Sequence, residues 1–338
     1  IWNPEAFFNV MVVNGVSWPE LEVAPAIYRF RLLNGSNSRF LNLSMTRYNK
    51  KGKAIQEFPF YQIGAEQSVL PQVVETVTGW ATPMTPGVSP SDKAYDRVRA
   101  PFAEQALLMG LAERADVLVD FRDLPNGTII RMLNTAPDAP FGGFPDVPAD
   151  PDTTGQVMQF RVNAALMGQG ATDPLLLDGT PNPNAATDPW NVQLSLPDAT
   201  DPALDLTANY TTQDLALLEE ESATVCVNFP MNGGIIVDTT ASPTHPADGT
   251  CTEFVIDPDT GEKILGALAG SVPFAPKAAV LGTQGSQGGR VQLWADPMRQ
   301  NPGLDSTETW ELWNWSADAH PIHLHLVKFK VVNREAFD

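Results

Sequence analysis

Short strand-like runs, each closed by turn residues, recur along this chain and limit the folds open to it. Residues 26–33 and 39–45 alternate apolar and polar side chains, and residues 115–121 form a mostly apolar run. A period of two places one set of side chains on the buried face of a sheet. Steps such as Asn-Gly separate these runs. The pattern predicts an all-β protein built from sandwich or barrel domains.

Further runs extend this prediction. Residues 128–133 are expected to pair back on 115–121 as a hairpin, and residues 157–162 to close a first domain. Residues 212–221 fit one short helix instead, with Asp214 as a cap and leucines on a partial apolar face. A second set of strands is expected at 224–229, 234–237, 253–256, 290–294, 309–315 and 323–332.

The length of 338 residues suits about two domains. We expect a first domain over residues 1–165 and a second over residues 216–338. Residues 166–215 are rich in Ala, Pro, Asp, Asn and Thr and are expected to be a linker. The chain lacks an initiator Met and ends just after a strand-like run, so we expect a piece of a longer protein.

The net charge and the two cysteines limit the classes of partner and the compartments that suit this chain. The net charge of −19 argues against nucleic acid, which needs a basic surface, and against anionic lipid. No apolar run reaches the ~18 residues of a membrane span. Cys226 and Cys251 either form one disulfide, which would fit an exported or cell-surface protein, or stay as two buried thiols. The location itself is not fixed by the sequence.

The strongest chemical signal is a cluster of histidines. Three of the four histidines in the chain, His320, His323 and His325, fall within six residues in the run His-Pro-Ile-His-Leu-His. In a strand, His323 and His325 would project from the same face, and His320, across Pro321, would be able to reach a different metal. Imidazole is a ligand for copper, zinc, iron and nickel. The run therefore predicts a metal site, with zinc as the competitor of copper.

The alternative is that these histidines are ordinary core or surface residues, but their clustering at the start of an apolar run disfavours that interpretation. Asp318 is a candidate acceptor for the second nitrogen of one imidazole. His245 lies alone in a segment rich in Pro, Thr and Ala and is predicted to have no function.

Several blocks of the sequence resemble the multicopper oxidases, and in particular the branch of bacterial laccases, spore-coat laccases and bilirubin oxidases. Residues 308–338, which contain the His-Pro-Ile-His-Leu-His run, resemble a segment of the last cupredoxin domain of that family. Two further blocks resemble its middle domain and appear in the family's order. They are Ala112-Glu113-Arg114-Ala115-Asp116, and Val13-Asn14-Gly15 with Trp18-Pro19, Tyr28-Arg29-Phe30-Arg31 and Asn34-Gly35-Ser36-Asn37.

This resemblance implies cupredoxin-like Greek-key β-sandwich or barrel domains, the second one truncated. It also implies type 1, type 2 and binuclear type 3 copper in the intact protein. His320 corresponds to a type 1 copper ligand, His323 to a type 2 ligand and His325 to a type 3 ligand, with no catalytic residue beyond the metal ligands. The implied partners are dioxygen, a small phenolic, aromatic or metal-ion reductant, and the absent first domain and C-terminal segment.

The sequence also departs from the family. Its other histidine motifs are absent, and neither Cys226 nor Cys251 is flanked by His, although a blue-copper site needs a Cys thiolate. The chain alone is therefore expected to be inactive. The leading hypothesis is part of a laccase-like oxidoreductase, and the alternative is a non-enzymatic copper-binding or structural cupredoxin module.

Overall fold

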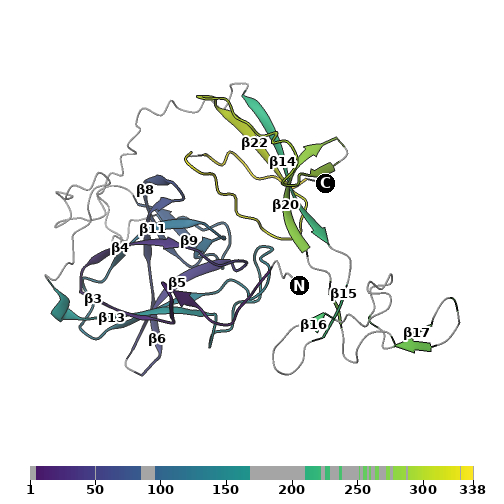
Figure 1. Ribbon diagram of the computed structural model, residues 1–338. Coiled ribbons are helices and arrows are strands. Elements are labelled where there is room, and N and C mark those ends of the chain that lie inside the picture. Colours follow the sequence, from purple (N-terminus) through teal and green to yellow (C-terminus); the bar gives the residue numbers. More distant parts are fainter. Residues whose placement is uncertain are drawn as a thin grey trace. The chain divides into compact units, whose positions relative to one another are not determined.

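The structure is a computed structural model that divides into two compact units, each described here by itself (Figure 1). The first unit is Ala6–Leu206 together with Asp318–Asp338, and the second is Thr207–Ala317 together with Ile1–Glu5. The structure describes residues 5–49, 51–84, 96–167, 210–221, 225–228, 236–237, 251, 254–256, 259, 263–265, 272–274, 277–286, 288–327 and 329–337.

Most of the predicted linker at 166–215 lies outside the described residues, and so does His245. The predicted domain limits of 1–165 and 216–338 remain a prediction. Residues 318–338 cluster with the first unit, although they follow the second unit in sequence.

The first unit contains two sheets. One has the strand order β10-β5-β12-β13-β3, with β6 also paired to β5, and its only parallel pair among these strands is β13–β3. The other has the order β4-β11-β7-β8-β9 and is antiparallel throughout. The strands of the first sheet are β3 (Glu20–Val23), β5 (Leu41–Tyr48), β6 (Ala54–Phe58), β10 (Leu107–Met109), β12 (Ile129–Asn134) and β13 (Gln156–Val162). Those of the second are β4 (Ile27–Leu33), β7 (Phe60–Ala65), β8 (Ser68–Val77), β9 (Trp80–Pro83) and β11 (Arg114–Asp120).

One hydrophobic core joins the two sheets. Met45 and Phe160 from the first sheet pack in the same buried cluster as Phe60 and Val117 from the second. The ring of Phe121, fully buried just after β11, lies 5.5 Å from that of Phe160. Burying a side chain of this size contributes roughly 1.5–3 kcal/mol. The sheets therefore pack face to face, and the predicted all-β sandwich is confirmed for this unit.

The central strand β11 is buried on both faces. Val117 and Val119 belong to the core between the sheets, whereas Leu118 packs into a second cluster on the outer face with Tyr61 and Val73. A strand with two covered faces reads as a continuous apolar run, which is why residues 115–121 were recognisable. The strands predicted at 26–33, 39–45 and 157–162 are likewise confirmed as β4, β5 and β13.

A small hairpin precedes these sheets. β1 (Val12–Val13) pairs with β2 (Val16–Ser17) around Asn14 and Gly15, which both have positive φ, at 49° and 84°. Positive φ at both central residues is the geometry that favours Asn-Gly in tight hairpins. The predicted Asn-Gly turn is confirmed.

The hairpin predicted between 115–121 and 128–133 is wrong. β11 pairs with β4 and β7, whereas β12 pairs with β5 and β13 in the opposite sheet. The connection after β11 thus crosses from one sheet to the other. β11 and β12 are therefore neighbours in the sequence, but they pair with strands of different sheets.

The second unit is also built from strands. Its largest sheet has the order β21-β20-β14-β22, and two smaller sheets have the orders β16-β15-β19 and β17-β18. The bounds are β14 (Thr211–Glu221), β15 (Val225–Asn228), β16 (Ile236–Val237), β17 (Phe254–Ile256), β18 (Lys263–Leu265), β19 (Val272–Phe274), β20 (Lys277–Gly285), β21 (Gly288–Val291) and β22 (Glu308–Asn314). The strands predicted at 224–229, 234–237, 253–256 and 309–315 correspond to β15, β16, β17 and β22, whereas the one predicted at 290–294 overlaps β21 only at residues 290 and 291.

The short helix expected at 212–221 is wrong, because this segment is the strand β14. β14 pairs antiparallel with β20 and parallel with β22, so neighbours on both sides can satisfy its backbone groups. Leu215, Ala216 and Leu217 are buried in succession, as expected for a strand covered on both faces. The closely spaced leucines of this central strand resemble the apolar face of a short helix, so the sequence pattern alone does not distinguish the two.

The two cysteines form a disulfide. Cys226 and Cys251 are bonded with their Cα atoms 5.8 Å apart, and both pack in a small cluster of their own. Of the two alternatives left open by the sequence, the structure contains the disulfide.

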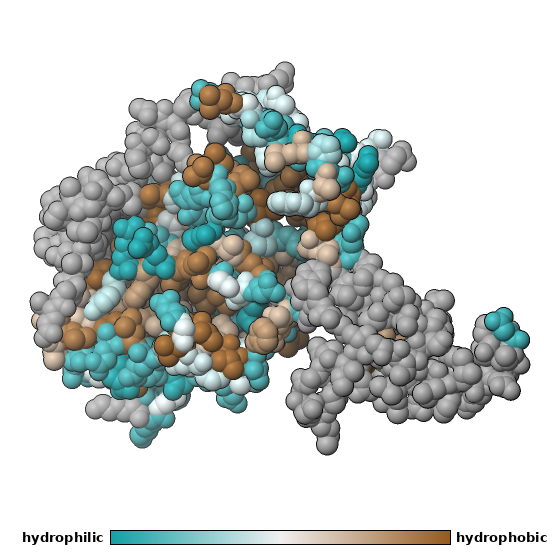
Figure 2. Space-filling view, in the orientation of Figure 1, coloured by the Kyte–Doolittle hydropathy of each residue, from teal (hydrophilic) through white to brown (hydrophobic). Residues whose placement is uncertain are grey.

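The remaining features of the fold are the residues on the face in view and the small amount of helix. On the face in view in Figure 2, hydrophilic and hydrophobic residues are interspersed. Within the described residues, the one helical element is the 3-10 turn Ala164–Leu166, and none is a helix long and apolar enough to cross a membrane.

Candidate metal centre

The three predicted metal ligands lie in the segment that follows β22. His320 and His323 are half-buried, and His325 is exposed. The strand predicted at 323–332 is wrong, since residues 320–327 and 329–337 have no strand partner in the structure. The backbone also turns at Leu326, whose φ is 65°. The extended geometry assumed for His323 and His325 therefore does not continue along this segment.

Backbone and ring contacts fix the start of this segment on the first unit. The backbone N–H of Ala319 donates a hydrogen bond of 2.7 Å to the carbonyl oxygen of Phe141, and its side chain packs against the cluster of Phe40, Ala136 and Phe141. Next, Pro321 lies over Gly110, where an added Cβ would come within 2.8 Å of the proline Cβ. His320 and His323 are thus held on either side of a packed proline.

His323 contacts two charged residues of the first unit. Its Nδ1 lies 2.6 Å from Oε2 of Glu66, and both ring nitrogens lie near Nη1 of Arg114, at 3.2 Å for Nδ1 and 3.0 Å for Nε2. The side chains of His323 and Glu66 are only 17% and 20% exposed, so this contact is shielded from solvent. The next residue is also held, because the side-chain amide of Gln67 donates to the carbonyl oxygen of Leu324.

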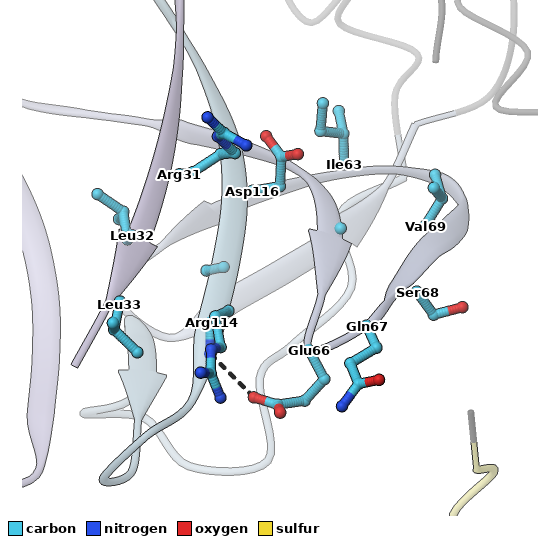
Figure 3. A pocket seen from close by; sticks show the side chains of 12 residues that line it. Arg31, Leu32, Leu33, Ile63, Glu66, Gln67, Ser68, Val69, Arg114 and Asp116 are labelled. Atoms are coloured by element: carbon cyan, nitrogen blue, oxygen red, sulfur yellow. Dashed lines mark hydrogen bonds between the residues drawn. The ribbon is translucent and has the colours of Figure 1, made fainter. Parts of the chain in front are cut away.

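The site for these contacts is built by the β7–β8 turn and the start of β11. The backbone N–H of Arg114 donates to Oε1 of Glu66 at 2.9 Å, and the N–H of Glu66 donates to the carbonyl oxygen of Arg114 at 3.0 Å. Figure 3 shows this pair from close by. The guanidinium of Arg114 also donates to the carbonyl oxygen of Ala112 at 2.7 Å. Both side chains are therefore positioned by their own strands.

Glu66 and Arg114 also line a cavity of about 350 Å³ on the outer face of the second sheet. Figure 3 shows polar and apolar side chains around it, drawn from β4, β7, β8 and β11. Its walls are Arg31, Leu32, Leu33, Ile63, Gly64, Glu66, Gln67, Ser68, Val69, Arg114, Ala115 and Asp116. The cavity and the contacts of His323 share one edge of the sheet.

A partly buried carboxylate lies next to this edge. Burial raises the pKa of Glu113, although the backbone N–H of Gly110 donates to its Oε2 at 2.6 Å and opposes that shift. The nearby charge of Glu66 raises the same pKa further, and Arg334 lowers it. Glu113 therefore links the loop under Pro321 to the charged residues around His323.

The histidines offer suitable donors for copper, but the described residues do not assemble a complete metal site around them. The rings of His323 and His325 lie 4.9 Å apart at 71°, so two imidazoles are close together. However, no group of three or more His, Cys, Asp or Glu side chains comes together as a metal site in the part of the chain that the structure describes. Nη1 of the Arg114 guanidinium lies within 3.2 Å of both ring nitrogens of His323. These contacts place a guanidinium and a carboxylate beside the imidazole of His323.

Sequence reasoning had identified the three histidines but not their contacts. Arg114 lies in the block Ala112-Glu113-Arg114-Ala115-Asp116, which by itself predicts no role for it, and the sequence around Glu66 carries no motif. Glu66 lies 257 residues from His323 in the chain. No local pattern indicates a pairing over that distance, although the positive φ of 54° at Glu66 marks a tight strand-to-strand turn.

Comparisons with known proteins show which proteins the chain is similar to. The family model described as multicopper oxidase matches residues 280–338, which contain all three clustered histidines. The multicopper oxidase LPR1 homolog 5 of Oryza sativa subsp. japonica is 27% identical over 98% of this chain and 34% of its own length. A laccase of Bacillus stratosphericus is 26% identical over 98% of this chain and 41% of its own length.

Among solved structures, the McoA multicopper oxidase of Aquifex aeolicus has 23% identity and a TM-score of 0.35, over 64% of this chain and 34% of that one. The chain spans about a third to two fifths of the length of the two curated relatives. Those relatives match it from end to end, and the family model covers the histidine run. The chain is therefore similar to multicopper oxidases over nearly all of its length, and the family model matches its last 59 residues.

Proposed function

We propose that this chain is part of a laccase-like, copper-dependent oxidoreductase. Such an enzyme oxidises small phenols, aromatic amines or metal ions by single electrons and reduces dioxygen to water. Four such oxidations balance one dioxygen, which takes up four electrons and four protons and yields two water molecules. The observation that carries this proposal is the His-Pro-Ile-His-Leu-His run within the residues matched by the multicopper oxidase model.

Within this proposal, His320 is a ligand of type 1 copper, His323 of type 2 copper and His325 of one type 3 copper. Imidazole nitrogen is a suitable donor for copper, which would supply the electron transfer and dioxygen chemistry. The role of the polypeptide is to fix the donors and to limit access to them. The half-buried positions of His320 and His323 and the exposure of His325 suit donors that face different surroundings.

Other copper ligands would come from outside this chain. Cys226 and Cys251 are joined in a disulfide, so neither offers the thiolate that a blue-copper site needs. The proposed partners are therefore a first domain and a C-terminal segment of the same protein. Dioxygen and the reducing substrate complete the set.

The test uses the parent protein that contains this chain and its double variant His323→Ala/His325→Ala. We expect the parent to hold copper and to consume dioxygen with a phenolic donor, and the double variant to lose oxygen consumption and part of the copper. His245→Ala is the matched control, since that histidine lies outside the cluster, and it should behave as the parent does. Circular dichroism verifies that all three proteins are folded.

Each other result has a definite meaning. Unchanged oxygen consumption in the double variant would refute the assignment of these two histidines. A parent that binds copper but consumes no dioxygen would favour the alternative of a copper-binding module. A parent protein without copper would favour a zinc site or a purely structural role.

A further inference from the structure

The cavity on the outer face of the second sheet combines an exposed cation with apolar walls. We propose that it binds a small organic carboxylate, with the carboxylate held by Arg31 and a compact apolar group lying against Leu33, Ile63 and Val69. This site is separate from the histidine run. The inference depends neither on copper nor on the proposed function.

Arg31 provides the positive charge of the site. It is exposed on β4, in register with Asp116 of β11. Asp116 is bound by Arg29 instead, whose Nε lies 2.9 Å from Oδ1 and 3.1 Å from Oδ2. Among the residues that the structure describes, Arg31 has no ion-pair partner. A ligand carboxylate can therefore accept the paired N–H groups of this guanidinium without breaking an existing ion pair.

The other charged groups of the cavity already have partners. Glu66 accepts a hydrogen bond of 2.9 Å from the backbone N–H of Arg114 and contacts Nδ1 of His323 at 2.6 Å. The Arg114 guanidinium donates to a backbone carbonyl oxygen at 2.7 Å. Counting Arg29, which pairs with Asp116, the site holds three arginines against two carboxylates, in a chain whose net charge is −19. The local excess of positive charge favours an anion here, although the chain as a whole is acidic.

The remaining walls are apolar and leave room for a small group. Figure 3 shows Leu33 on one side of the cavity and Ile63 and Val69 on the other. Gly64 and Ala115 also line it, and they carry the smallest side chains. The volume of about 350 Å³ is at the lower end of the roughly 300–1,000 Å³ of small-molecule sites. A ligand with one compact apolar group therefore suits this cavity.

Strand geometry places the charged and apolar parts of the site next to each other. Arg31 and Leu33 are two residues apart in β4, so their side chains project from the same face of the sheet. Leu32, between them, packs against the core on the other face. Two residues of a strand span about 7 Å. Benzoate, in which the carboxylate is attached directly to a ring, is a probe of the right kind for this spacing.

The experiment titrates benzoate into the 338-residue chain by calorimetry, with benzamide and acetate as comparison ligands. Benzamide keeps the ring without the charge, and acetate keeps the charge without the ring. We expect saturable binding of benzoate at one site, at least about tenfold tighter than that of either comparison ligand. Methyl NMR locates the site: signals of Leu33, Ile63 and Val69 should shift, whereas those of Val117 and Val119, in the core between the sheets, should not.

Two variants separate the charged from the apolar contribution. Arg31→Gln should lower the affinity for benzoate about tenfold and leave that for benzamide unchanged. Leu33→Ala should lower it severalfold, and because Leu33 is 57% exposed this truncation does not open the core. Arg122→Gln is the matched control, since Arg122 is an exposed arginine just after β11 that pairs with Asp120 outside the cavity. It should bind benzoate as the unmodified chain does.

Absence of saturable benzoate binding to the unmodified chain would overturn the inference. Equal affinity for benzoate and benzamide would do the same, and so would equal losses in Arg31→Gln and Arg122→Gln, because Arg31 would then not hold the carboxylate. Methyl shifts confined to other parts of the chain would place the ligand elsewhere and overturn it as well. None of these measurements involves the histidines, so failure here leaves the proposed oxidoreductase function to its own test.

Discussion

The side-chain oxygen of Asn134 accepts a hydrogen bond of 3.0 Å from the backbone N–H of Asn42, so two buried asparagines connect β5 and β12. The Asn42 amide in turn donates to the carbonyl oxygen of Glu104 and to Oγ1 of Thr135, both at 2.8 Å, and accepts from the N–H of Ala106 at 2.7 Å. Its side chain therefore ties the loop before β10 to the first sheet.

Replacement of Asn42 by alanine is expected to destabilise the chain by about 3 kcal/mol, because a buried donor and acceptor lose their partners at roughly 1–3 kcal/mol each. Urea denaturation monitored by tryptophan fluorescence measures the free energy of unfolding. The exposed Asn37→Ala is the control and should change it by less than about 0.5 kcal/mol. A loss in Asn42→Ala no larger than in the control would refute the structural role of this amide.

Gly110 provides a test of docking that does not touch a charged residue. A Cβ at this position would meet Pro321 at 2.8 Å and the ring of Phe40 at 3.1 Å, so Gly110→Ala should displace the proline segment from the first unit. We expect faster hydrogen exchange at Ala319 with little change in exchange within β11. Gly35→Ala, where an added Cβ meets nothing within 4 Å, is the control. Unchanged protection of Ala319 in Gly110→Ala would contradict the packing described.

The sequence predicts those elements whose structure depends on residues that are close together in the chain. β11 was predictable because Val117, Leu118 and Val119 are apolar on both faces, and the β1–β2 turn because Asn14 and Gly15 tolerate positive φ. β14 was not predictable, since consecutive buried leucines suit a central strand and a helix alike.

The candidate site was likewise predictable only in part. Three histidines within six residues are visible in the sequence alone. The contacts of His323 with Glu66 and Arg114 join residues 257 and 209 positions apart, and only the folded sheet brings them together. The strand expected after His323 was wrong because its apolar pattern has no strand partner in the described residues.

Glu75 is expected to make stability depend on pH. It is 8% exposed, and burial raises its pKa above 4.5, an effect that Arg97, with its Nη2 at 3.3 Å, partly opposes. The folded state then binds more protons than the unfolded state between 4.5 and the raised pKa, so this carboxylate costs stability at higher pH. Relative to Glu75→Gln, the unmodified chain should gain stability as the pH falls through that window.

The control for Glu75 is a carboxylate shifted in the opposite direction. The hydrogen bond from Arg161 lowers the pKa of Glu20, so the stability that Glu20 contributes is present at neutral pH and is lost as the pH falls through its lowered pKa. Relative to Glu20→Gln, the unmodified chain should therefore lose stability on acidification, by a smaller amount because this pair is exposed to solvent. Urea titrations at several pH values measure both differences, and equal signs would contradict the pKa directions.

The Cys226–Cys251 disulfide is expected to stabilise the second unit. It closes a loop with a sequence separation of 25 residues, and loss of such a constraint on the unfolded chain corresponds to about 3 kcal/mol. Reduction, or the double variant Cys226→Ala/Cys251→Ala, should therefore lower the free energy of unfolding by a similar amount. Because both cysteines are in this bond, reductant should leave the double variant unchanged. A reductant effect of equal size in the variant would show that the loss does not come from the disulfide.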